Sequence, residues 1–170
     1  ILGRHAWQEG AKKTAEKAHI DIAHYERLSK EQIQAIEDKA NSFILHGIKV
    51  KVEELDRGDA ESRFGFSIYQ GHGVLSKRLR IVEIYDLEGN LIDAEACGGL
   101  HLEGKESSIG IIKIRNAYRI HDGIDRLEYV AGPAVQQYIN EVMQSLDSMS
   151  TLLGIDRDKL SESMESKIKE

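Results

Sequence analysis

The stretch 79–97, LRIVEIYDLEGNLIDAEAC, contains the pattern that decides the fold. Residues 79–85 and 91–96 are rich in apolar and β-branched side chains, and Glu88-Gly89-Asn90 between them favours a tight turn. Two short apolar runs joined by such a turn predict an antiparallel pair of strands. The loop that begins at Cys97 therefore starts where the second strand of this pair ends.

Further strands and one long helix are predicted on both sides of this hairpin. The helix is predicted from Ser29, whose spacing to Gln32 matches a capping box, to Gly47, a residue type that commonly ends helices. The additional strands are expected at residues 18–25, 48–52, 109–114 and 127–130. We therefore expect an α+β fold in which a mostly antiparallel sheet is packed with one long helix.

The region after residue 132 has a different pattern. Pro133 lies where a helix would begin, Gly154 interrupts the helix, and Asp156 can cap a second one. The first helix has apolar residues at spacings of four and three, namely Val135, Ile139, Val142, Leu146, Met149 and Leu153. We expect a C-terminal helical hairpin that packs on itself, in preference to a true coiled coil, although these helices could also support a homodimer.

Composition limits the class of protein. The chain of 170 residues has a net charge of −6, which argues against a stand-alone RNA-binding protein, because phosphate contacts require a basic surface. No apolar run is long enough to cross a membrane, and no secretory segment opens the chain. The single cysteine cannot form an internal disulfide, so we expect a cytoplasmic protein.

The motif Cys97-Gly98-Gly99-Leu100-His101 places two types of zinc ligand four positions apart. The two glycines allow the sharp backbone turn that a metal loop needs, but an ordinary turn with a buried cysteine has the same pattern. Zinc requires four ligands, or three and a water molecule. No convincing second pair of ligands is found among the other histidines, which are His5, His19, His24, His46, His72 and His121. Spacing alone therefore offers at most half of a zinc site and leaves the ordinary turn as the alternative.

Several motifs, in chain order, resemble the editing region of alanyl-tRNA synthetases of the archaeal type. They cover about residues 1–132, and the combination is more specific than any one motif. The matching segments are Leu2-Gly3-Arg4-His5-Ala6-Trp7-Gln8-Glu9-Gly10-Ala11, residues 18–25, Phe64-Gly65-Phe66, Tyr69-Gln70-Gly71, the motif at 97–101, and residues 106–110 and 119–132.

The resemblance implies a division of the chain and a set of site residues. Residues 1–132 would be the editing (second additional) domain without its N-terminal His-x-x-x-His part, and residues 133–170 a helical connector toward an oligomerisation domain. Zinc would be held by two histidines upstream of residue 1 together with Cys97 and His101. Gln8 would lie in the editing pocket, where it could orient a water molecule or the amino group. The backbone amides of Gly98 and Gly99 could stabilise a developing oxyanion.

The resemblance also implies the reaction, which is hydrolysis of tRNA(Ala) wrongly charged with serine or glycine, with the tRNA acceptor end as partner. Editing is needed because a binding pocket discriminates poorly between such small side chains. Zinc could activate water or orient the substrate, and the sequence leaves both roles open. Aminoacylation and its ATP would belong to a catalytic domain outside this chain.

Two other functions remain open at this point. The chain could be a free-standing alanyl-tRNA editing hydrolase, or a non-catalytic fragment for tRNA binding or oligomerisation. The cut-looking ends and the C-terminal helices favour the synthetase. We expect the 170-residue chain by itself to hold zinc weakly and to deacylate poorly, because two ligands cannot close a tetrahedral site.

Overall fold

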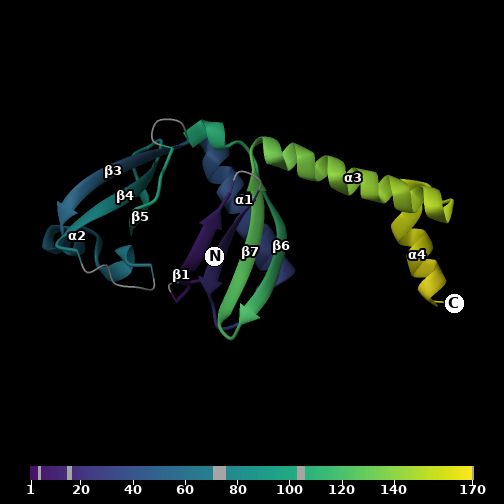
Figure 1. Cartoon of the computed structure of the whole chain (residues 1–170), viewed down its shortest axis with the longest axis horizontal. Helices are drawn as coiled ribbons and strands as arrows, with labels where there is room; N and C mark the ends of the chain where they lie inside the picture. The colour runs from purple at the N-terminus through teal and green to yellow at the C-terminus, as the bar shows by residue number, and fades with distance from the viewer. Residues whose placement is uncertain (4, 15–16, 71–75, 103–105, 170) are drawn as a thin grey trace. The chain divides into compact units, whose positions relative to one another are not determined.

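The computed structural model describes all residues of the chain except 4, 15–16, 71–75, 103–105 and 170. The chain divides into two compact units, Ile1–Gly132 and Pro133–Glu170 (Figure 1). Antiparallel strands and separate helices make up the first unit, and helices alone make up the second. The predicted α+β class is therefore confirmed.

The first unit contains a four-stranded antiparallel sheet in the order β1-β2-β7-β6. Its strands are β1 (Trp7–Lys13), β2 (Ala18–Ala23), β6 (Ile112–His121) and β7 (Ile124–Ala131). β6 and β7 form a hairpin whose turn contains Gly123 with a φ of +74°, a conformation that favours glycine. The predicted strand at 18–25 is present, although it ends at Ala23.

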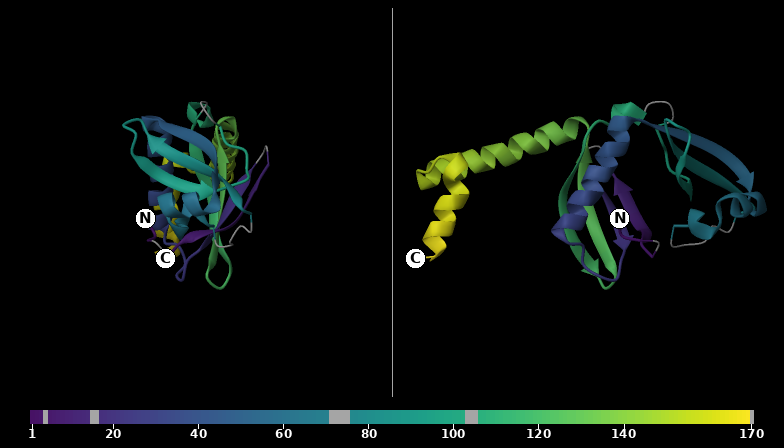
Figure 2. Two further views of the ribbon diagram at one scale, coloured as in Figure 1. Left: turned by 90° about the vertical axis from the view of Figure 1, so that its left-hand side faces the viewer. Right: turned by 180° about the vertical axis from the view of Figure 1, so that it is seen from behind.

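Helix α1 (Lys30–His46) covers one face of this sheet, as the view from behind in Figure 2 shows. The predicted capping box is present, since Ser29 accepts from the backbone N–H of Gln32 and the Gln32 side chain accepts from that of Ser29. The buried carboxylate of Glu37 accepts a hydrogen bond of 2.6 Å from the N–H of Ile114 and pairs with Lys113 at 2.7 Å. Polar contacts therefore attach this helix to β6.

The hairpin predicted from residues 79–97 belongs to a second antiparallel sheet, in the order β3-β4-β5. Its strands are β3 (Ile48–Asp56), β4 (Arg78–Asp86) and β5 (Leu91–Ala96). The hairpin itself is confirmed, but the expected single sheet is in fact two. Alternating polarity indicates which residues form strands, but not which strands pair with each other.

One face of the second sheet forms a core with helix α2 (Arg57–Phe64) and the turn η1 (Phe66–Ile68). Its buried apolar residues are Ala60, Ile68, Leu79, Ile81 and Ala94.

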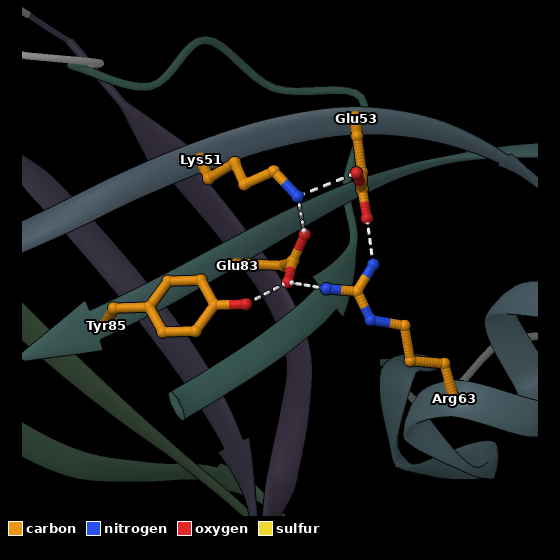
Figure 3. A network of polar contacts seen from close by, with 5 residues as sticks. All are labelled: Lys51, Glu53, Arg63, Glu83 and Tyr85. Carbon is orange, nitrogen blue, oxygen red and sulfur yellow. Dashed lines mark hydrogen bonds and ion pairs between the residues drawn. The ribbon is translucent and has the colours of Figure 1, made fainter. Parts of the chain in front are cut away.

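A charged network lies beside this core (Figure 3). Glu83 is fully buried and accepts hydrogen bonds from Lys51, Arg63 and Tyr85, while Glu53 pairs with the same two cations. The hydrogen bond to Glu83 raises the pKa of Tyr85, as does burial. Because a buried carboxylate requires such partners, this network joins α2 to β3 and β4.

The second unit consists of α3 (Pro133–Leu153), the turn η3 (Arg157–Lys159) and α4 (Leu160–Lys169). The two predicted helices are present, and Gly154 lies between them with a φ of +65°. Figure 1 shows α4 turning away from the end of α3. Ile139 and Met149 on the predicted apolar stripe are 41% and 54% exposed, so the stripe is incompletely covered. Within the described parts of the chain, no helix is long and apolar enough to span a membrane.

Candidate metal centre

Cys97 and His101 lie at the end of β5, and their side chains point toward each other. The Sγ atom of Cys97 is 3.4 Å from Nε2 of His101. Zinc–sulfur and zinc–nitrogen bonds of about 2.3 Å and about 2.0 Å at a tetrahedral angle would place two such atoms about 3.5 Å apart. The pair therefore has the separation that two ligands of one zinc ion require.

Of the two glycines in the loop, Gly99 lies next to the Cys97 and His101 side chains. A Cβ atom added to Gly99 would meet Sγ of Cys97 at 3.4 Å and Nε2 of His101 at 3.9 Å. The N–H of Gly99 donates to Sγ of Cys97 at 3.3 Å. Gly98 is exposed, and no described atom lies within 4 Å of the position of its missing Cβ. In this conformation Gly99 thus supports the ligand atom, and the oxyanion role of the two glycines stays a prediction.

Arg80 of β4 holds the loop in place, a role that the sequence analysis missed. Its Nη1 donates to the carbonyl oxygens of Cys97 at 2.6 Å and Gly99 at 2.9 Å. The N–H of Cys97 also donates to the carbonyl of Arg80 at 3.0 Å, which extends the β4–β5 pairing by one residue. A charged residue within an apolar strand was the available signal for this role.

Gln8 lies on β1 and is half-buried. Its Nε2 donates to Oε1 of Gln70 at 2.9 Å, and the side chain of Gln70 in turn hydrogen-bonds Glu95 of β5. The structure therefore connects Gln8 to the strand that leads into Cys97 through one intervening side chain. From the sequence, Gln70 was recognisable only as part of a motif, and no pattern indicated a role for Glu95.

Glu95 has an unusual electrostatic environment. Burial and the neighbouring carboxylate of Asp93 raise the pKa of Glu95 to about 7, an effect that Gln70 partly opposes. Its Oε2 atom is buried and, within the described part of the chain, has no hydrogen-bond partner. A polar group with a perturbed pKa next to candidate metal ligands is typical of functional sites.

The other histidines that the structure describes do not complete the metal site. His5 and His24 contact each other, with Nε2 of His5 2.8 Å from Nδ1 of His24, and their rings stack. His46 interacts with the carbonyl of Ser42 at the end of α1, at 2.7 Å, and His72 lies outside the described residues. Among the residues that the structure describes, no three metal-ligand side chains form a group. Cys97 and His101 fit zinc as two of its ligands and require others.

Comparison with known proteins gives one consistent result. The alanine–tRNA ligase of Hyperthermus butylicus is 47% identical over 154 residues, which are 91% of this chain and 16% of that protein. The alanine–tRNA ligases of Saccharolobus islandicus and Methanococcus maripaludis are each 44% identical over 160 residues, 94% of this chain and 17% of those proteins. No family model matches the chain.

The chain therefore spans about one sixth of the length of these relatives, and nearly all of it is homologous to a segment of them. The resemblance to archaeal-type alanyl-tRNA synthetases is confirmed at this level.

Proposed function

From the homology of nearly the whole chain to a segment of archaeal alanine–tRNA ligases, we propose that it forms part of the editing site of such an enzyme. The proposed reaction is hydrolysis of the ester that joins serine or glycine to tRNA(Ala). Aminoacylation, and the ATP that it consumes, are assigned to a domain outside this chain. The structural observation that supports the zinc site in this proposal is the 3.4 Å separation of Cys97 Sγ and His101 Nε2.

In this proposal Cys97 and His101 are two of the zinc ligands. When bound, zinc would supply a Lewis acid that lowers the pKa of water or orients the ester carbonyl. The N–H of Gly99 donates to Sγ of Cys97, and Arg80 holds the loop in the conformation that brings the two ligands together. The chain's own residues thus prepare the ligand pair before metal or substrate arrives.

Gln8 and Glu95 act on the substrate side of the proposed site. The bond to Gln70 uses one N–H of the Gln8 amide. The second N–H can donate to a water molecule, and the amide oxygen can accept from a water molecule or from the amino group. The partner would be the acceptor end of tRNA(Ala). A chain of net charge −6 supplies little general attraction for phosphate, so we assign most of the tRNA affinity to other parts of the ligase.

The proposal is tested by release of serine and glycine from mischarged tRNA(Ala), using the complete natural polypeptide that contains this chain. Cys97→Ala and His101→Ala should each reduce both zinc content and ester hydrolysis by at least tenfold. Leu45→Ala, at an 85% exposed position of α1, is the control for handling and folding. Full activity and full zinc content in the Cys97→Ala variant would refute the proposal.

An alternative role in oligomerisation is favoured by one observation, the exposed apolar residues of α3. It is compatible with the editing role, because α3 belongs to the second compact unit and the ligand pair to the first. A free-standing hydrolase would use the same residues, and the sequence that flanks this chain distinguishes it from a ligase.

A further inference from the structure

A directed series of hydrogen bonds leads from Gln8 of β1 to Glu95 of β5. The Gln8 Nε2 donates to the Gln70 Oε1 at 2.9 Å, and Gln70 hydrogen-bonds the Glu95 carboxylate. Because the Gln70 oxygen is already an acceptor and a carboxylate can only accept, the Gln70 amide NH2 donates to Glu95. Gln70 therefore fixes one oxygen of this carboxylate and leaves the other for a different donor.

The second oxygen of Glu95 has no such donor among the residues that the structure describes. Oε2 is buried without a hydrogen-bond partner in the described part of the chain, where no lysine or arginine is paired with this residue either. The nearest arginine along the β4–β5 pair, Arg80, directs its Nη1 to the carbonyls of Cys97 and Gly99. A buried carboxylate oxygen in this state requires a donor from outside the described chain, preferably a cationic one.

Glu95 also lies on the correct side of the strand to act at the candidate metal centre. Residues two positions apart in a strand share a face and are separated by about 7 Å. The N–H of Cys97 still pairs with the carbonyl of Arg80, so this alternation extends from Glu95 to Cys97. A group bound to the Glu95 carboxylate would therefore be close enough to Cys97 and His101 for one aminoacyl ester to reach both the carboxylate and the metal.

We infer that Glu95, held by Gln70 and Gln8, is the binding subsite for the α-ammonium group of the aminoacyl ester. This inference rests on the proposed function, because that substrate carries an ammonium group one carbon from the scissile carbonyl. The ammonium group offers three donors and a positive charge to an oxygen that receives neither from the described residues. The subsite selects aminoacyl esters over esters that lack an amino group, and it leaves the choice between alanine and serine to other contacts.

The test compares two substrates in the complete, zinc-loaded polypeptide. One is seryl-tRNA(Ala), and the other is the same tRNA esterified with glyceric acid, in which a hydroxyl replaces the ammonium group. For Glu95→Gln we expect kcat/KM on the seryl ester to fall at least tenfold, with less than a threefold change on the glyceric acid ester. Glu95→Asp, which keeps the charge, should restore part of the loss, and Gln70→Met should show a smaller loss with the same selectivity.

Zinc content and ligand binding separate the competing explanations. Zinc should stay stoichiometric in Glu95→Gln, and its loss would show that Glu95 supports the metal instead. Equal losses on the two esters, or no loss on either, would also overturn the inference. Binding of 3′-(L-seryl)amino-3′-deoxyadenosine gives a readout without hydrolysis. It is compared with binding of the corresponding amide of glyceric acid. If the wild type hydrolyses neither ester yet binds the seryl amide at least tenfold more tightly, the hydrolase proposal fails and the subsite stands.

Discussion

Arg80 donates a hydrogen bond of 2.6 Å to the backbone carbonyl of Cys97, and so a cation on one strand holds the first residue of the candidate metal loop on the next. The same Nη1 atom reaches the carbonyl of Gly99. The loop conformation that brings Cys97 and His101 together thus depends on a side chain that is itself no ligand.

Replacement of Arg80 by methionine should therefore weaken zinc binding. Groups that orient metal ligands typically contribute about 10–100-fold in affinity, and we expect a loss in that range, with the fold retained. Competition with a chromophoric chelator measures it in the complete polypeptide. Arg78→Met is the matched control, because Arg78 lies two residues away on β4 and its ion pair with Glu54 is exposed and long at 3.8 Å. Equal affinities of the two variants would contradict the prediction.

The 170-residue chain expressed alone should bind zinc weakly. Its described residues bring two zinc ligands together, whereas a tight site needs at least three. Equilibrium dialysis followed by metal analysis should find much less than one zinc per chain. Stoichiometric zinc that survives dialysis would mean that another residue of this chain completes the site.

Removal of the Glu37 carboxylate should destabilise the first unit. The residue is 7% exposed, and its side chain accepts from the N–H of Ile114, which Glu37→Ala would leave without this acceptor. The cost of an unsatisfied buried group predicts a loss of about 1–3 kcal/mol in the free energy of unfolding. Urea denaturation measures it, with Asp38→Ala, at the next and exposed position of α1, as the control. If both variants changed the free energy of unfolding equally, the contact between Glu37 and β6 would make no measurable contribution to stability.

The ion pair between Asp21 and Arg126 should make stability depend on pH in the acid range. The hydrogen bonds from Arg126, at 2.7 and 2.8 Å, hold the pKa of Asp21 below its ordinary value of 3.8. A carboxylate whose pKa is lower in the folded state contributes stability above its unfolded pKa, and that stability is lost as the pH falls through the folded pKa.

The free energy of unfolding of the wild type should therefore exceed that of Asp21→Asn by a constant amount at neutral pH. This difference should shrink as the pH falls below about 4, the ordinary range of an aspartate. Denaturation at a series of pH values measures the difference, and Asp59→Asn, at an exposed position of α2, serves as control. A difference that does not shrink at all below pH 4 would show that the ion pair is not its source.

The second unit should self-associate weakly through α3. Ile139 and Met149 expose 41% and 54% of their surface on the apolar stripe, and burying such residues is the main source of association energy. Sedimentation equilibrium should show a mass that rises with concentration, and Met149→Ser should reduce this rise. A monomer at high concentration would leave the stripe without a role in dimer formation.

Many features of this protein were predictable from neighbouring residues alone. The capping box at Ser29, the end of α1 at Gly47 and the hairpin around Gly89 are formed by groups within a few positions of one another. The pairing of Cys97 with His101 belongs to the same class, because a loop of three residues can close it. Such features depend on local backbone geometry, which the sequence encodes directly.

The functional context of that pair came only from the tertiary structure. Gln8 and Gln70 are 62 positions apart, and their contact, like the place of Glu95 next to them, results from the arrangement of two sheets that were expected to be one. Alternation along a strand determines which side chains share a face, but it does not determine the neighbouring strand. The sequence by itself therefore determined most of the helices and strands and the proximity of Cys97 and His101, and the long-range packing decided which polar groups surround that pair.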